Sequence, residues 1–242
     1  MRPYECLAID SNTLAYWRFG ERLTLADQSG HGLDVTLGGS GAIITPDGLD
    51  VSAANGYAQA ALNLSAVADL TVEGWFRYLS TDDNPADITT LFQWAVALTD
   101  AIRVYTVAGT DYLKLALRVE AQDVAYALTY QLTAAQLAAF RAEGGAHIAA
   151  TVDRDGLGGH THKLWFNGVQ IITYTNSLPA WTDAAGTMYL GRGLGYFVGI
   201  IDEVRISDVV RYSAAFAPRR HSDGRRALVR GPLTADAPGV LA

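Results

Sequence analysis

The stretch FVGIIDEVRISDVVRYSAAFAP, residues 197–218, begins like a β-strand, because apolar and β-branched residues follow one another closely. Two carboxylates, Asp202 and Glu203, stand in the middle of this apolar run. A carboxylate pair in such a place can serve catalysis, hold a metal ion or form internal ion pairs. The residues on either side of the pair help to separate these three roles.

Side chains on a strand alternate between its two faces, and this period of two predicts where each carboxylate points. The alternation places Asp202 on the apolar face and Glu203 on the opposite face, if no β-bulge shifts it. Glu203 would then pair with Arg205 on the solvent side. A buried Asp202 needs an arginine, backbone N–H donors or a cation such as Ca²⁺ as its partner. The nearest arginines in the sequence are Arg192 and Arg211.

The rest of the chain also predicts β structure. Half of its 242 residues are hydrophobic, and its 24 glycines separate short runs rich in aromatic and β-branched residues. One such run covers residues 13–21, and the Asn167–Gly168 pair between two others indicates a tight hairpin. A single short helix is expected within residues 132–145, where Thr133 and Gln136 form a capping box. This pattern is typical of an all-β, two-sheet antiparallel sandwich or jelly roll.

Charge and composition limit the classes of partner. The net charge of −7 argues against nucleic acid, and no apolar run is long enough for membrane insertion. Cys6 is the single cysteine, so an intrachain disulfide is excluded. The first residues lack the apolar core of a secretory signal, which predicts a soluble chain that is made in a cytoplasm, whatever its final location. Residues 218–242 carry five arginines and two aspartates, so we expect a domain over 1–217 and a basic extension that docks on another chain or stays solvated.

The sequence offers few candidates for a catalytic or ligand-binding site. A retaining glycosidase needs two carboxyl groups about 5 Å apart, and Glu73 stands alone in its strand, so we expect no catalytic residues. His160 and His162 share a strand face but lack a third metal ligand nearby in the sequence. Trp181 and Tyr196 lie in or beside loops, where an aromatic ring can stack on a sugar, plug the sandwich or face another subunit.

Several segments together resemble the laminin G-like domains of the concanavalin A-like lectin/glucanase superfamily. They are LAYWRFGE…LADQSGHGLDVTL, LTVEGWFRY, HIAATVDRDG…HKLWFNGVQI and MYLGRG…FVGIIDEVRISDVVRYSAAFAP, and they span roughly residues 13–218. The resemblance implies a jelly roll. It also implies a calcium ion near the last strand, with Glu21, Asp27 and Asp202 at the matching positions and loop carbonyls completing the shell.

These observations predict a non-enzymatic protein of a bacteriophage virion, associated with the tail, baseplate or fibres. A phage particle is assembled in the host cytoplasm and acts outside the cell, which fits a lectin-like fold without a secretion signal. The expected partners are other virion proteins and cell-surface glycan, and the expected assembly is a homo-oligomer. The alternative is a bacterial carbohydrate-binding module of a larger secreted protein, followed by a glycoside hydrolase.

Overall fold

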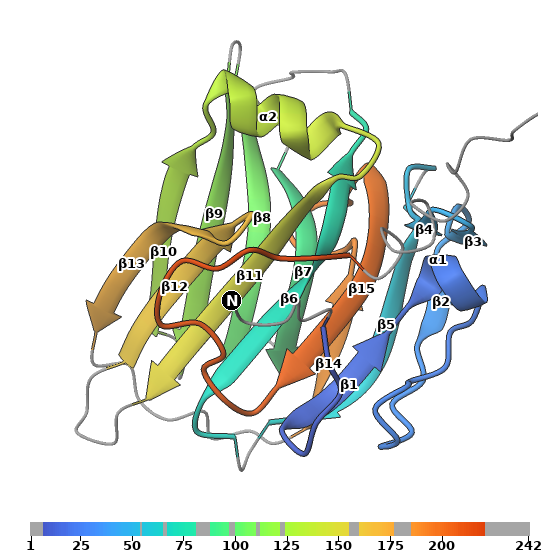
Figure 1. Ribbon diagram of the computed structural model, residues 1–242, viewed down its shortest axis with the longest axis horizontal. Coiled ribbons are helices and arrows are strands. Elements are labelled where there is room, and N and C mark those ends of the chain that lie inside the picture. The colour runs from blue at the N-terminus through green and yellow to red at the C-terminus, as the bar shows by residue number, and fades with distance from the viewer. Residues whose placement is uncertain are drawn as a thin grey trace, which may run out of the picture.

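The computed structural model describes residues 7–53, 55–64, 67–80, 88–96, 100–109, 112–121, 124–154, 160–176 and 185–220. Within these residues the chain forms two antiparallel β-sheets packed face to face, with the longer helix across one end (Figure 1). The predicted fold class, an all-β two-sheet jelly-roll sandwich, is confirmed.

The described strands form sheets of eight and seven strands. In spatial order the eight-stranded sheet contains β13 (Val169–Asn176), β12 (His160–Phe166), β11 (Ala146–Arg154), β6 (Leu70–Tyr78), β15 (Gly199–Ser207), β4 (Gly48–Asp50) and β3 (Ile43–Thr45), with β1 (Thr13–Trp17) paired to β15. The seven-stranded sheet contains β10 (Val124–Gln131), β9 (Tyr112–Ala121), β8 (Asp100–Gly109), β7 (Ile88–Val96), β14 (Ala185–Leu190), β5 (Tyr57–Asn63) and β2 (Thr36–Gly38).

The hydrophobic core lies between the two sheets. The Phe76 ring of one sheet is 6.0 Å from the Phe92 ring of the other and 6.3 Å from Phe197, and all three side chains are fully buried. Helix α2 (Ala134–Arg141) closes one end of the sandwich, where Phe140 stacks on Tyr78 at 5.6 Å. The inward side chains of the two sheets therefore form the apolar core of the fold.

Two local predictions are confirmed and one is incomplete. The capping box of Thr133 and Gln136 starts α2, and Asn167 and Gly168 take the positive φ values of 47° and 76° that a tight hairpin requires. The strand expected over residues 13–21 ends at Trp17, and a one-turn helix, α1 (Phe19–Arg22), follows it. No helix in the described part of the chain has the length and apolarity to span a membrane.

The predicted alternation in β15 is wrong, because a β-bulge interrupts it. The register against β6 shifts between Asp202 and Arg205, and Glu203 has a φ of +48°. As a result Ile201 and Val204 both belong to the core, and Asp202 lies outside it. The bulge therefore places Asp202 on the side away from the core, although simple alternation groups it with the core residues Val204 and Ile206.

The chain that follows β15 crosses the outer face of the eight-stranded sheet. In Figure 1 this segment, residues 208–220, passes in front of β11 and β12, and we call it the strap. The Phe216 backbone N–H donates to the Gly168 carbonyl at 3.1 Å, and the Tyr212 and Phe216 rings stack with centres 3.6 Å apart. Only the first residues of the predicted extension, 218–220, are among the described residues, so the boundary at 217 stays a prediction.

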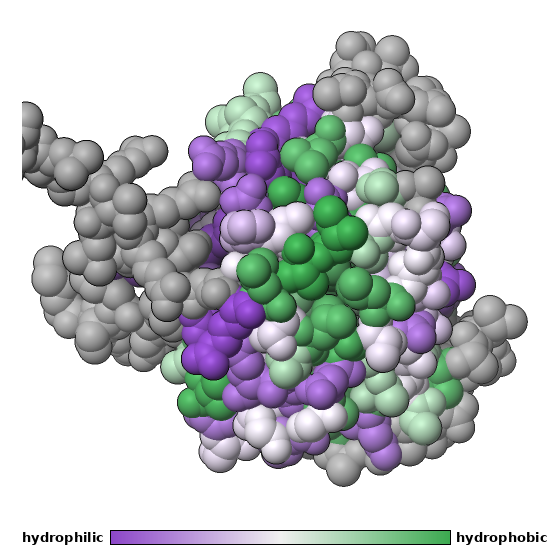
Figure 2. Space-filling model, turned by 90° about the vertical axis from the view of Figure 1, so that its right-hand side faces the viewer, coloured by the Kyte–Doolittle hydropathy of each residue, from purple (hydrophilic) through white to green (hydrophobic). Residues whose placement is uncertain are grey.

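Besides the outer faces of the two sheets, the molecule has a side surface where the edge strands β3 and β2 lie. Figure 2 shows hydrophobic residues gathered in the centre of this face, which carries α1, β2 and β3. The exposed large apolar residues of these three elements and their ends are Leu23, Leu37 and Ile43.

Candidate functional site

Asp202 is held by hydrogen-bond donors of the protein. Its Oδ1 accepts from the Gly20 backbone N–H at 3.1 Å, and its Oδ2 accepts from Arg220 of the strap at 2.8 Å. Of the partners considered from the sequence, the backbone and an arginine are both present. The arginine is Arg220, however, and neither Arg192 nor Arg211. Gly20 is required there, because a Cβ at this position would come within 2.7 Å of a backbone oxygen and 3.2 Å of Asp202.

The other carboxylate, Glu203, was expected on the solvent side in a pair with Arg205. It is instead fully buried, and Arg205 pairs with Glu73 on the neighbouring strand β6. The bulge explains both corrections, since it places Arg205 directly opposite Glu73 on the outer face of the sheet.

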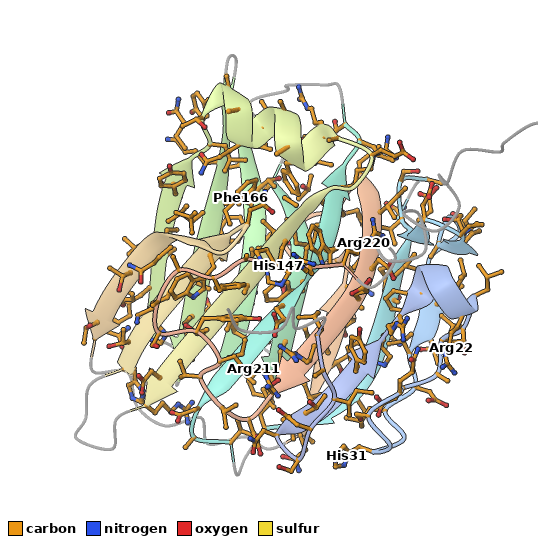
Figure 3. The ribbon with its side chains drawn as sticks, in the orientation of Figure 1. Arg22, His31, His147, Phe166, Arg211 and Arg220 are labelled. Carbon is orange, nitrogen blue, oxygen red and sulfur yellow. The ribbon has the colours of Figure 1, made fainter. Side chains whose placement is uncertain are left out.

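Glu73 is the centre of a buried polar cluster beneath the strap. Its Oε1 accepts from Arg205 Nε at 2.9 Å and Nη2 at 2.6 Å, and its Oε2 contacts His147 Nε2 at 3.0 Å and accepts from the Tyr212 hydroxyl. Figure 3 shows His147 in the middle of this sheet, with Arg220 and Arg211 along the strap. Arg211 binds Asp10 with two hydrogen bonds of 2.7 and 2.8 Å, which ties the strap to the N-terminal segment.

The environment of Glu73 keeps its carboxylate charged. Burial raises its pKa, but the His147 hydrogen bond and the Arg205 charge outweigh burial and lower the pKa to about 2. Burial, reinforced by the Glu73 charge, raises the pKa of Tyr212 well above its usual range. The Glu73 carboxylate has no exposed surface, and Arg205 and Tyr212 donate hydrogen bonds to it. It is therefore better suited to anchor the strap than to act as a catalytic acid or nucleophile.

Two of the three calcium ligands implied by the resemblance, Asp27 and Asp202, accept hydrogen bonds from the protein itself. Asp27 accepts four hydrogen bonds of 2.7 to 3.1 Å, from backbone N–H groups of Tyr16, Ser29 and Leu33 and from the Ser29 hydroxyl. Burial raises the pKa of Asp27, but these donors outweigh it and lower the pKa. The Glu21 side chain lies outside the described residues. Among the residues that are described, no three His, Cys, Asp or Glu side chains form a metal-binding group.

We therefore expect calcium to leave the thermal stability unchanged. An ion that binds the native state must raise the melting temperature, and a chelator must lower it again. Scanning calorimetry with about 2 mM Ca²⁺, and then with excess chelator, checks this expectation. A calcium-dependent rise in melting temperature would mean that the donors around Asp27 or Asp202 give way to the ion.

His160 and His162 lie side by side in β12, as the sequence suggests, with ring centres 6.3 Å apart. His162 contacts Asn176 at 3.2 Å and stacks on Tyr174, and burial lowers its pKa to about 4. Within the described residues the pair has no third metal ligand. The His162 ring therefore packs as a neutral side chain against Tyr174.

Of the two loop aromatics expected to bind a ligand, Trp181 lies outside the described residues and Tyr196 lies within them. Tyr196 is 37% exposed, and its ring centre is 6.4 Å from that of Tyr57. The Tyr57 ring is in turn 6.2 Å from that of Tyr189. The guanidinium carbon of Arg192 lies 4.6 Å from the centre of the Tyr57 ring and 5.3 Å from that of Tyr189. We call these four residues, Tyr57, Tyr189, Arg192 and Tyr196, the tyrosine wall.

The tyrosine wall stands beside a cavity of about 320 Å³ on the outer face of the seven-stranded sheet. Its lining residues come from β7, β14 and the turn after β14, and they are Gln93, Ala95, Val96, Ala185, Thr187, Tyr189, Arg192 and Gly193. Their neighbours Trp94 and Met188 point into the core, so alternation explains why the lining side chains face outward.

Strand register places the polar and the small residues of this face in two adjacent rows. One row runs across five strands and consists of Gln59, Tyr189, Gln93, Arg103 and Arg118. The next row is mostly small and consists of Ala61, Thr187, Ala95, Ala101 and Glu120. The small row leaves space at the cavity, and the polar row edges it with hydrogen-bonding groups.

The loop that carries Arg192 and Tyr196 is tied to β7. Backbone N–H groups of Gly191 and Thr90 donate to the carbonyls of Leu91 and Gly195 at 2.8 and 3.2 Å, and the Leu194 N–H donates to the Thr90 hydroxyl at 3.0 Å. Tyr57 is fixed from the other side, since its ring lies over Gly38, where an added Cβ would come within 2.2 Å of a ring atom. The tyrosine wall is therefore held in place before any ligand arrives.

Solved structures with a similar fold include three binding domains. The receptor binding domain of botulinum neurotoxin D has a TM-score of 0.62 at 13% identity, and the match covers 85% of this chain and 51% of that one. The binding domain of Paraclostridial Mosquitocidal Protein 1 has a TM-score of 0.61 at 18% identity, with coverage of 85% and 51%. The binding domain of botulinum neurotoxin DC in complex with SialylT has a TM-score of 0.59 at 14% identity, with coverage of 84% and 49%.

This chain therefore spans about half the length of those binding domains, and at these identities the likeness shows a shared fold. The comparison with curated protein sequences found no match. A family model described as the concanavalin A-like lectin/glucanases superfamily, of laminin G type, matches residues 52–215. Because this match covers more than half of the chain, the protein belongs to the laminin G-like family of that superfamily.

Proposed function

We propose that the protein is a non-enzymatic carbohydrate-binding domain and that the tyrosine wall and its cavity form the binding site. The observation that carries this proposal is the cluster of three tyrosines and an arginine beside a cavity of about 320 Å³. Ligand pockets in proteins measure about 300 to 1,000 Å³, so this cavity is at the lower end of that range.

The chemistry of the site suits a sugar ring. Saccharides present apolar C–H faces that pack on aromatic rings, and hydroxyl groups that need hydrogen-bond partners. The tyrosines supply the rings, while Thr187 and Gln93 supply polar groups at the cavity. The structural relatives include one binding domain determined in complex with SialylT, which supports a saccharide ligand without identifying it for this chain.

Replacing Tyr57 or Tyr196 by alanine is expected to weaken saccharide binding about tenfold, because each change removes a stacking surface. Tyr126→Ala is the matched control, since Tyr126 is 40% exposed on the edge strand β10, where its ring contacts Tyr174. A glycan array identifies a ligand, and calorimetric titration of the three variants measures the affinity. If the three variants bind the saccharide with the same affinity, the tyrosine wall is not the binding site.

We also propose the setting that the sequence predicts, a bacteriophage virion in which the protein binds host-surface glycan or decorates the particle as a homo-oligomer. This proposal rests on the lectin-like fold, which is suited to binding glycans on a host surface. Mass spectrometry of purified phage particles would detect the protein, and light scattering would give its oligomeric state. Genes for secreted polysaccharide-degrading enzymes beside its own gene would favour the alternative, a bacterial carbohydrate-binding module.

A further inference from the structure

We propose that the site selects acidic saccharides and that Arg192 binds their carboxylate. This inference rests on the proposed function and deepens it, since it names the class of ligand. Its basis is the position of one charged side chain relative to the cavity.

Arg192 is the one residue with a formal charge among the described residues that line the cavity. Within the described part of the chain, its contacts are the stacking contacts with Tyr57 and Tyr189, and no carboxylate pairs with it. By contrast, Arg103 and Arg118 on the same face both pair with Glu120. Among the described residues, Arg192 is thus a half-buried cation without a carboxylate partner.

The contacts with the Tyr57 and Tyr189 rings hold the Arg192 guanidinium in place and leave its N–H donors available for a ligand. A guanidinium that lies over aromatic rings keeps its N–H donors in the plane of the fork, where they match the two oxygens of a carboxylate. Thr187 lines the same cavity and can bind a hydroxyl group of the sugar that carries the carboxylate. Arginine, cavity and ring surface together fit a uronic-acid type of sugar better than a neutral one.

The charged residues on the outer face of the seven-stranded sheet also favour an acidic ligand. The described outward side chains of its strands include Arg103, Lys114 and Arg118 against one carboxylate, Glu120, and the loop adds Arg192. The chain as a whole has a net charge of −7. An excess of positive charge on one face of an acidic protein favours anionic ligands on that face.

The test is a titration of the ¹⁵N-labelled full chain with sodium glucuronate, glucose and sodium acetate at constant ionic strength, followed by NMR. We expect glucuronate to shift the Arg192 side-chain signal and the amides of Tyr189 and Gly193, and to bind about tenfold more tightly than glucose or acetate. Arg192→Gln should remove this preference, and Arg192→Lys should recover only part of it, because lysine lacks the planar fork.

Lys163→Gln is the matched control, because it removes one positive charge from β12 on the opposite sheet, where Lys163 lies 6.0 Å from the Trp165 ring. It should bind glucuronate like the unchanged protein. Equal binding of glucose and glucuronate at the cavity would overturn the acidic preference but leave the proposed saccharide site intact. Acetate binding as tight as glucuronate binding would overturn the saccharide part. If glucuronate, glucose and acetate all leave the signals of the cavity residues unchanged, both proposals are overturned.

Discussion

Replacing Glu73 by alanine is expected to lower the free energy of unfolding by about 3 to 5 kcal/mol. The change leaves Arg205, which is 5% exposed, without the carboxylate that receives two of its hydrogen bonds. It also removes the acceptor of the Tyr212 hydroxyl and the partner of His147 Nε2, so the strap loses one of its polar attachments. Urea unfolding followed by tryptophan fluorescence measures the loss.

Two further variants make this prediction specific. Glu143→Ala removes an exposed carboxylate just after α2, and its effect should stay within about 0.5 kcal/mol. The double variant Glu73→Ala, Arg205→Ala should lose less than the sum of the two single losses, because neither charge is then left buried alone. A Glu73→Ala loss below about 1 kcal/mol would show that the cluster does not stabilise the fold.

The stability is expected to fall in two steps as the pH decreases. His162 has a pKa lowered from 6.5 to about 4 by burial, so the folded state resists the proton that the unfolded chain accepts. Its contribution is complete above pH 6.5 and is lost as the pH falls toward 4. For Glu73 the pKa is lowered from 4.5 to about 2, so its contribution is complete above pH 4.5 and is lost between 4.5 and 2. Each step corresponds to about 3 kcal/mol at most.

Two variants separate the steps. Asn in place of His162 should remove the upper step and keep the lower one, while Glu73→Gln should do the reverse. In the lower window the salt bridge of Asp10 with Arg211 acts in the same direction, because this arginine lowers the pKa of Asp10. Urea midpoints measured from pH 8 to about 2 would show the two windows. An unchanged midpoint across this range would contradict the lowered pKa values of His162 and Glu73 that the two steps require.

The fold was predictable from the sequence because its signals are local. The capping box at Thr133, the Asn167–Gly168 hairpin and the alternating strands each depend on residues close to one another in the chain. The bulge at Glu203 is different. It depends on how β15 registers against β6, more than a hundred residues earlier in the chain, and nothing in DEVRI itself shows that one residue is extra.

The polar cluster and the tyrosine wall were missed for a related reason. Glu73 read as a lone carboxylate because its partners Arg205 and His147 come from other strands. Tyr57 and Tyr189 read as ordinary strand residues, although alternation with Ala58, Ala60 and Met188 could have shown that both point outward. Arg192 was considered as a partner for Asp202, and only the sheet register places it beside the tyrosines instead.

The position of β15 has a consequence for how the protein is made. Residues 199–207 form the last strand of the eight-stranded sheet, yet they lie inside it, between β6 and β4, and they carry β1 as well. During synthesis, the edge of β6 that pairs with β15 therefore stays unpaired until residues 199–207 have been made. An open strand edge is a template for pairing with the wrong chain. A chain cut short before residue 199 would therefore leave β6 with an open edge where β15 joins it to β4.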